Sequence, residues 1–103
     1  MNIHEFGLDK EKTIVLIHPS LVMWDYFEYV RPLLKDKYHV IIPALPGYDE
    51  ENPNENFTSV EEIADNLLGW LKEHKIEKVD LLYGCSMGGS IALKMFSNHG
   101  IKI

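Results

Sequence analysis

The chain has 103 residues, of which 46% are hydrophobic and 25% are charged, which is the composition of one small globular domain. Ten basic residues against sixteen acidic ones leave a formal charge of -6, which argues against nucleic acid or an anionic membrane as a partner. A single cysteine cannot close an internal disulfide, no apolar run approaches the roughly 18 residues that span a bilayer, and the N-terminus does not resemble a signal peptide. We therefore expect a cytoplasmic domain that binds neither nucleic acid nor membrane.

Short apolar runs alternate with longer amphipathic segments along the chain. Three such runs are Thr13–Ile17, Tyr38–Ile42 and Val79–Tyr83, and each is followed closely by proline or glycine. This pattern is typical of strands that are buried on both faces in a parallel sheet. We interpret 101–103 as the start of a further strand and residues 1–6 as an edge strand.

Helical periodicity fills the intervals between these runs. Apolar residues recur at three- and four-residue spacing over residues 24–34, although Pro32 must start, kink or shorten this helix. A second apolar stripe covers residues 60–71, and a third helix is predicted to open at Ser86 and to stop at Gly100. The second helix is preceded by a capping box with two possible pairings, Ser59 with Glu62 or Thr58 with Glu61.

Alternation of strands and helices predicts an α/β fold with a predominantly parallel sheet and flanking helices, in one domain over residues 1–103. The sequence shows no internal repeat and no interdomain linker. The one long polar stretch, Asp49–Asn56, is either an acidic rim over a binding site or a hydrated surface loop, and its spacing favours the loop.

The sharpest functional signal is a G-x-S-x-G motif between a predicted strand and a predicted helix, formed by Gly84, Ser86 and Gly88. A serine at a very sharp strand-to-helix turn presents its hydroxyl above the sheet edge, and the crowded turn favours glycine two residues before and after it. The helix that follows directs free backbone N–H groups at the same point, where negative charge is stabilised. The alternative interpretation is a glycine-rich turn that only tightens the packing of helix on sheet.

Two further motifs extend this pattern. His18-Pro19-Ser20 closes the first buried strand, and Ile42–Tyr48 reads I-P-A-L-P-G-Y. With the G-x-S-x-G motif, they make the sequence resemble the α/β-hydrolase superfamily from about Thr13 to Ile103. The resemblance implies an α/β-hydrolase-like fold that is truncated, because family members are usually more than twice this length, with a catalytic acid, a histidine and a cap that follow later.

The resemblance also assigns roles to individual residues. Ser86 matches the nucleophile, Met87 matches one backbone N–H donor of the oxyanion hole, and Ser20 matches the other. The sequence departs from the usual family pattern at Pro19 and Ala44, where glycine and aspartate are common.

The remaining candidates are weaker. His18 is favoured as a strand-end residue that hydrogen-bonds its own loops rather than as a base, and His18 and Trp24 are candidates for lining a pocket. Packing is favoured over redox chemistry for Cys85. The histidines show no metal-ligand spacing, so we expect no metal and no other cofactor.

The leading hypothesis is therefore a serine hydrolase, esterase-like, that forms an acyl-enzyme through Ser86 on a small-molecule ester or related acyl substrate. A C–C hydrolase, acyltransferase or lyase would keep the same turn, and a non-catalytic binding or interaction protein would keep the fold alone. The 103-residue fragment is expected to be inactive alone. We also expect it to self-associate through the truncated sheet edge.

Overall fold

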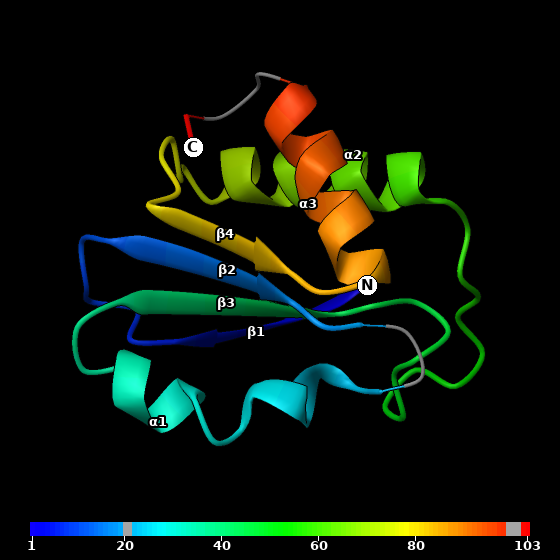
Figure 1. Cartoon of the computed structure of the whole chain (residues 1–103), viewed down its shortest axis with the longest axis horizontal. Helices are drawn as coiled ribbons and strands as arrows, with labels where there is room; N and C mark the ends of the chain where they lie inside the picture. Colours follow the sequence, from blue (N-terminus) through cyan, green and yellow to red (C-terminus); the bar gives the residue numbers. More distant parts are fainter. Residues whose placement is uncertain (20–21, 99–101) are drawn as a thin grey trace.

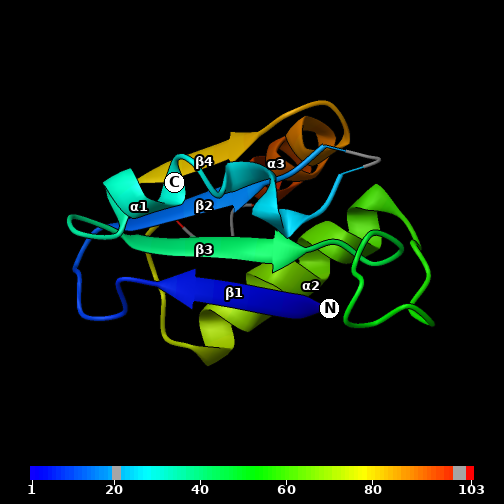
Figure 2. The ribbon, with the colours of Figure 1, turned by 90° about the horizontal axis from the view of Figure 1, so that it is seen from below.

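A computed structural model describes residues 1–19, 22–98 and 102–103. Its four strands form one sheet in the order β1-β3-β2-β4, and Figure 2 shows them side by side in this order. The elements in chain order are β1 (Asn2–Phe6), β2 (Thr13–Ile17), the 3-10 helix η1 (Trp24–Phe27), α1 (Arg31–Leu34), β3 (His39–Ala44), α2 (Val60–Glu73), β4 (Leu81–Gly84) and α3 (Met87–Ser97).

The sheet is predominantly parallel, as the sequence predicts. β2 pairs in parallel with β3 on one side and with β4 on the other, whereas β1 is an antiparallel edge strand on β3. The sequence-based end of β3 at Pro43 is wrong, because the strand continues to Ala44. The pairing with β2 has already stopped at Ile41, and Pro43 lies opposite Ile3 of the edge strand, so the missing N–H interrupts no ladder with β2.

Helices cover both faces of the sheet. α2 and α3 lie on one face, and η1 and α1 lie on the other (Figure 1). Alternate side chains of the strands pack on opposite faces of the sheet. Val15 and Ile17 belong to a cluster with Ile63 of α2, while Leu16 belongs to a second cluster with Phe27 of η1. This two-sided burial is the physical reason for the uninterrupted apolar runs of β2 and β3, in which every residue is buried. The expectation of two-sided burial is wrong for the third run, because β4 covers only Leu81–Gly84 and exposes Leu81 and Tyr83.

The helix predicted over residues 60–71 is confirmed as α2, whereas the helix predicted over residues 24–34 is not continuous. At α2 the side chain of Ser59 accepts a hydrogen bond from Glu62 N–H at 3.1 Å, which selects the first of the two capping boxes. The segment 24–34 is divided into η1 and α1, because Pro32 lacks an N–H and fits the first turn of a new helix rather than the middle of a continuous one.

The expected further strand and the expected stop at Gly100 fall partly outside the described residues. α3 ends at Ser97 with Asn98 as its C-cap. Lys102 forms an isolated parallel bridge with Lys78, and Val79 N–H donates to the carbonyl of Lys102 at 2.8 Å. Residues 102–103 therefore lie beside the chain that leads into β4, on the side away from β2.

An apolar face is exposed beside β4 and α3. Leu93 is 71% exposed and Phe96 is 58% exposed on α3, and Leu81 and Tyr83 of β4 are also exposed. In the part of the chain that the structure describes, β4 pairs along its length with β2 alone. Among these same residues, no helix is long and apolar enough to cross a membrane.

We expect the 103-residue chain to self-associate through this face, because contiguous exposed apolar side chains beside a free strand edge recruit partners. Light scattering at tens of micromolar is expected to show dimers or larger species, and Phe96→Glu is expected to lower the mass. Tyr29→Glu is the matched control, since Tyr29 is exposed on the opposite face of the sheet, after η1. A monodisperse monomer for the unmodified chain would contradict the prediction.

Candidate active site

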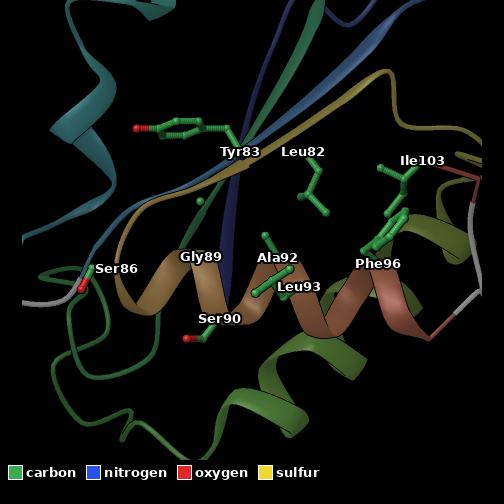
Figure 3. Close-up of a pocket in the computed structure, with 10 residues that line it drawn as sticks. Leu82, Tyr83, Ser86, Gly89, Ser90, Ala92, Leu93, Phe96 and Ile103 are labelled. Carbon is green, nitrogen blue, oxygen red and sulfur yellow. The ribbon is translucent and has the colours of Figure 1, made fainter.

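The turn between β4 and α3 holds Ser86 in a strained backbone conformation. Ser86 has φ 56° and ψ -119°, in a region that L residues other than glycine rarely adopt. It is the N-cap of α3, and its side chain is exposed at the end of the sheet (Figure 3). The predicted sharp strand-to-helix turn is therefore confirmed, and the structure refines the first helical residue to Met87.

Gly84 and Gly88 make this turn possible. A Cβ on Gly84 would overlap the carbonyl of Gly88 and lie 2.7 Å from the nitrogen of Gly89. A Cβ on Gly88 would overlap the carbonyl of Ile17 and lie 2.8 Å from the carbonyl oxygen of His18. Backbone thus packs directly on backbone where α3 crosses the ends of β4 and β2. The packing-only interpretation accounts for both glycines, but it does not account for the positive φ of Ser86.

The N-terminus of α3 presents the backbone N–H of Met87 beside Ser86. The N–H groups of Gly88, Gly89 and Ser90 donate to carbonyls of Cys85 or Ser86 at 2.9 to 3.2 Å. Among the described residues, by contrast, no acceptor pairs with the N–H of Met87. This donor is available for an anion at the start of the helix. Ser20, the expected second donor, lies outside the described residues.

Comparison with known proteins agrees with this geometry. Residues 14–102 match the model of the alpha/beta hydrolase family. The chain belongs to that family. It is 34% identical over 82 residues to the uncharacterized hydrolase YugF of Bacillus subtilis, covering 80% of this chain and 30% of the relative.

Two solved structures extend the comparison. A family protein from Desulfitobacterium hafniense superposes with a TM-score of 0.92 at 35% identity, covering 98% of this chain and 40% of that one. The esterase EaEST from Exiguobacterium antarcticum gives a TM-score of 0.77 at 27% identity, covering 95% and 36% respectively. The chain therefore spans less than half the length of these family members.

His18 of this α/β hydrolase chain is a buried, neutral strand-end residue. Its Nδ1 lies 2.8 Å from the carbonyl of Pro19 and its Nε2 lies 3.1 Å from the N–H of Leu45. Because a carbonyl only accepts and an N–H only donates, Nδ1 carries the proton and Nε2 accepts. Burial lowers the pKa of His18, although the Pro19 carbonyl and the charges of Asp25 and Asp49 oppose this shift. The ring ties two loops together, as the sequence predicts.

This arrangement predicts a pH-dependent stability. The folded state holds His18 neutral below its ordinary pKa of about 6.5, whereas the unfolded chain takes up a proton there. Stability is therefore expected to fall as the pH falls below about 6.5, by up to roughly 1.4 kcal/mol per pH unit. Urea denaturation between pH 7.5 and 5.5 measures this slope. His18→Gln should flatten it, and equal slopes in the two proteins would contradict the prediction.

A hollow of about 600 Å³ opens beside Ser86 along α3. Figure 3 shows Ser86 at one end and Ile103 at the other, with the side chains of α3 between them. The side chains that line it come mainly from α3 and β4 and include Tyr83, Ser90, Leu93 and Phe96.

His18 and Trp24 do not line this hollow, and the expectation that they line a pocket stays a prediction. The ring of His18 is buried between its two backbone partners, and Trp24 stacks on His4 with centroids 3.7 Å apart. Trp24 also packs against the cluster on the η1 and α1 face, which is the face opposite α3. The side chains of α3 that line this hollow did have a signal in the sequence: α3 carries apolar residues on both sides, with Ile91 and Met95 buried and Leu93 and Phe96 exposed.

Metal chemistry has no visible site in the described ranges. Within residues 1–19, 22–98 and 102–103, no group of three His, Cys, Asp or Glu side chains is arranged to hold a metal ion. Cys85 is a free thiol of intermediate exposure beside Ser86. The turn presents the exposed hydroxyl of Ser86 next to the backbone N–H of Met87.

Proposed function

We propose that this chain supplies the nucleophile and one oxyanion donor of a serine hydrolase that acts on esters or related acyl compounds. The observation that carries the proposal is the strained conformation of Ser86, φ 56° and ψ -119°, at the N-terminus of α3. Strain of this kind persists only where the surrounding structure enforces it, and here it exposes a hydroxyl beside the N–H of Met87. The sequence similarity to the esterase EaEST favours ester substrates.

The chemistry would proceed in two steps. In the first, Ser86 Oγ bonds to the acyl carbon while its proton passes to a base, the carbonyl oxygen becomes an oxyanion near Met87 N–H, and the C–O bond to the alcohol breaks. The base then gives its proton to the departing alcohol. In the second step, the same base takes a proton from a water molecule, which attacks the acyl carbon. The bond from the acyl carbon to Ser86 Oγ then breaks, the base returns the proton to Oγ, and the carboxylic acid is released.

A histidine imidazole is the base that this chemistry requires, held by a carboxylate. His18 does not fit the role, because its one lone pair already accepts from Leu45 N–H. We therefore propose that the base and its orienting acid come from residues outside this chain's 103, in keeping with the greater length of its relatives.

A fluorophosphonate probe applied to the protein as its gene encodes it tests the proposal. The probe is expected to label Ser86 covalently, as located by peptide mass spectrometry, and the label is expected to be lost in Ser86→Ala. Ser90→Ala is the matched control, because Ser90 is an exposed serine one turn further along α3. No labelling of a folded protein would favour a non-catalytic binding protein with the same fold.

A further inference from the structure

Charged residues are distributed unevenly between the two edges of the sheet at which its strands begin and end. β2, β3 and β4 are parallel, so their carboxyl ends share the edge that holds Ser86 (Figure 1). We call the segments at this edge, residues 18–19, 22–28, 44–62 and 84–90, the nucleophile edge. They contain half of the sixteen acidic residues and none of the ten basic ones. The acidic residues are Asp25, Glu28, Asp49, Glu50, Glu51, Glu55, Glu61 and Glu62.

The opposite edge carries most of the basic residues. The turns 7–12, 35–38 and 74–80, together with Lys102, contain seven of the ten basic residues. Acidic neighbours are interspersed there, and Lys78 lies 3.4 Å from Asp80. The net charge of -6 is therefore concentrated at the nucleophile edge rather than spread over the surface.

Several of these carboxylates lie close to the site. Glu61 and Lys94 line the same shallow hollow on α2 and α3 as Ser90, which is one turn after Ser86. The charges of Asp25 and Asp49 both act on the ring of His18, whose carbonyl lies against Gly88 of the turn. The α-amino group of Met1 does add one positive charge at this edge, but it is paired with Glu55 at 2.8 Å.

We propose that the nucleophile edge creates a negative potential at Ser86, which makes the site selective for uncharged or cationic acyl substrates and unfavourable for anionic ones. The substrate selectivity rests on the proposed function of Ser86, whereas the potential does not. A cleft lined by one sign of charge changes the association rate of charged ligands by roughly 10- to 1,000-fold. The stretch Asp49–Asn56, for which the sequence favours a hydrated loop, contributes four of these charges and so acts as an acidic rim as well.

The potential is measurable without catalysis. In a Cys85→Ala/Ser86→Cys variant, the new thiolate attacks the sulfenyl sulfur of a methanethiosulfonate, forming a disulfide and releasing methanesulfinate. The rates with the trimethylammonium-ethyl and sulfonatoethyl reagents give a cation-to-anion ratio, which is divided by the same ratio for free 2-mercaptoethanol. The charges at the nucleophile edge could also change the pKa of the new thiol, but this effect cancels in the ratio, because both reagents react with the same thiolate.

We expect a normalised ratio of at least about 10 at 10 mM salt. It should approach 1 at 1 M salt, where the Debye length is about 3 Å. Leu8→Cys in the same Cys85→Ala background is the matched control at the opposite edge, where Leu8 is 68% exposed, and its ratio should stay within about twofold of 1. A ratio near 1 at position 86, or equal ratios at both positions, would overturn the proposal.

Charge-reversal variants distinguish the effect of the local charge at the nucleophile edge from the effect of the net charge of the whole chain. Glu50→Lys at the nucleophile edge and Glu77→Lys at the opposite edge change the net charge equally, but only the first should lower the ratio at position 86 several-fold. Equal effects would overturn the proposal. If circular dichroism shows that Ser86→Cys prevents folding, Ser90→Cys at the same edge replaces it.

The outcome is also distinguishable from failure of the proposed function. Fluorophosphonate labelling of Ser86 without a cation preference at position 86 overturns this inference alone. A cation preference without labelling supports the potential while removing the hydrolase chemistry.

Discussion

Gly84→Ala is expected to destabilise the protein by about 3 kcal/mol or more, at the upper end of overpacking costs. The added Cβ would overlap the carbonyl of Gly88 and lie 2.7 Å from the nitrogen of Gly89. These atoms belong to the backbone of α3, which cannot move aside as a flexible side chain would. Relief would require α3 to shift away from β4, and the turn at Ser86 would change with it. Urea denaturation measures the free energy of unfolding.

Gly69→Ala provides the matched control with the opposite sign. Gly69 is inside α2, and a Cβ there would meet nothing within 4 Å. Since alanine is the better helix former by about 1 kcal/mol, this variant is expected to be more stable than the unmodified chain. Equal and small effects at the two glycines would show that the backbone contact at the turn is looser than described here.

The 103-residue chain alone is expected not to turn over p-nitrophenyl acetate at an enzymatic rate. A serine hydroxyl is a weak nucleophile until a base takes its proton. Among the described histidines, His18, His39 and His74 each hydrogen-bond another group: the Pro19 carbonyl and Leu45 N–H, the carboxylate of Glu5, and the Trp70 carbonyl, respectively. His4 stacks on Trp24 and lies on β1, at the far side of the sheet from β4, and His99 lies outside the described part of the chain.

With oxyanion donors and binding alone, triad enzymes retain roughly 10³–10⁴-fold acceleration over water, and no more is expected here. The release of p-nitrophenolate by the purified chain is compared with that of Ser86→Ala under the same conditions. Multiple turnovers that disappear in the variant would contradict the prediction, because they would require a base within these residues or one supplied by a second copy.

The strands and the strand-to-helix turn at Ser86 were predictable because local sequence dictates them. The run Ile14–Ile17 has no polar position to face solvent, so a strand covered on both sides is expected there. The spacing of Gly84, Ser86 and Gly88 predicts the sharp turn for a similar local reason, since the crowded backbone leaves no room for a Cβ at either glycine position. The division of residues 24–34 into η1 and α1 was harder to predict, because the effect of Pro32 on a helical pattern depends on where the chain turns back to the sheet.

The surroundings of Ser86 were not predictable in the same way. Closeness to a strand end does not determine whether a side chain such as that of His18 points into the core or towards a pocket. The exposed residues of α3 follow an ordinary apolar helix pattern, and their role depends on the strand beside which α3 lies. The concentration of charge at one end of the strands, by contrast, follows from the parallel direction that the sequence predicts, because this direction brings the segments after β2, β3 and β4 together.

The sheet order also has a consequence for the order in which the domain folds. β1, β2 and β3 all lie within the first 44 residues, whereas the contact between Thr13 N–H and the carboxylate of Asp80 joins residues 67 apart. Closing the longer loop costs more chain entropy, so the three-stranded part should assemble before β4 docks. Because Gly88 packs on the carbonyls of Ile17 and His18, the backbone of Ser86 can reach its strained conformation only after that docking. Formation of the strained turn at Ser86 is thereby tied to the last long-range step of folding, and intermediates that lack β4 on the sheet would hold Ser86 in an ordinary backbone conformation.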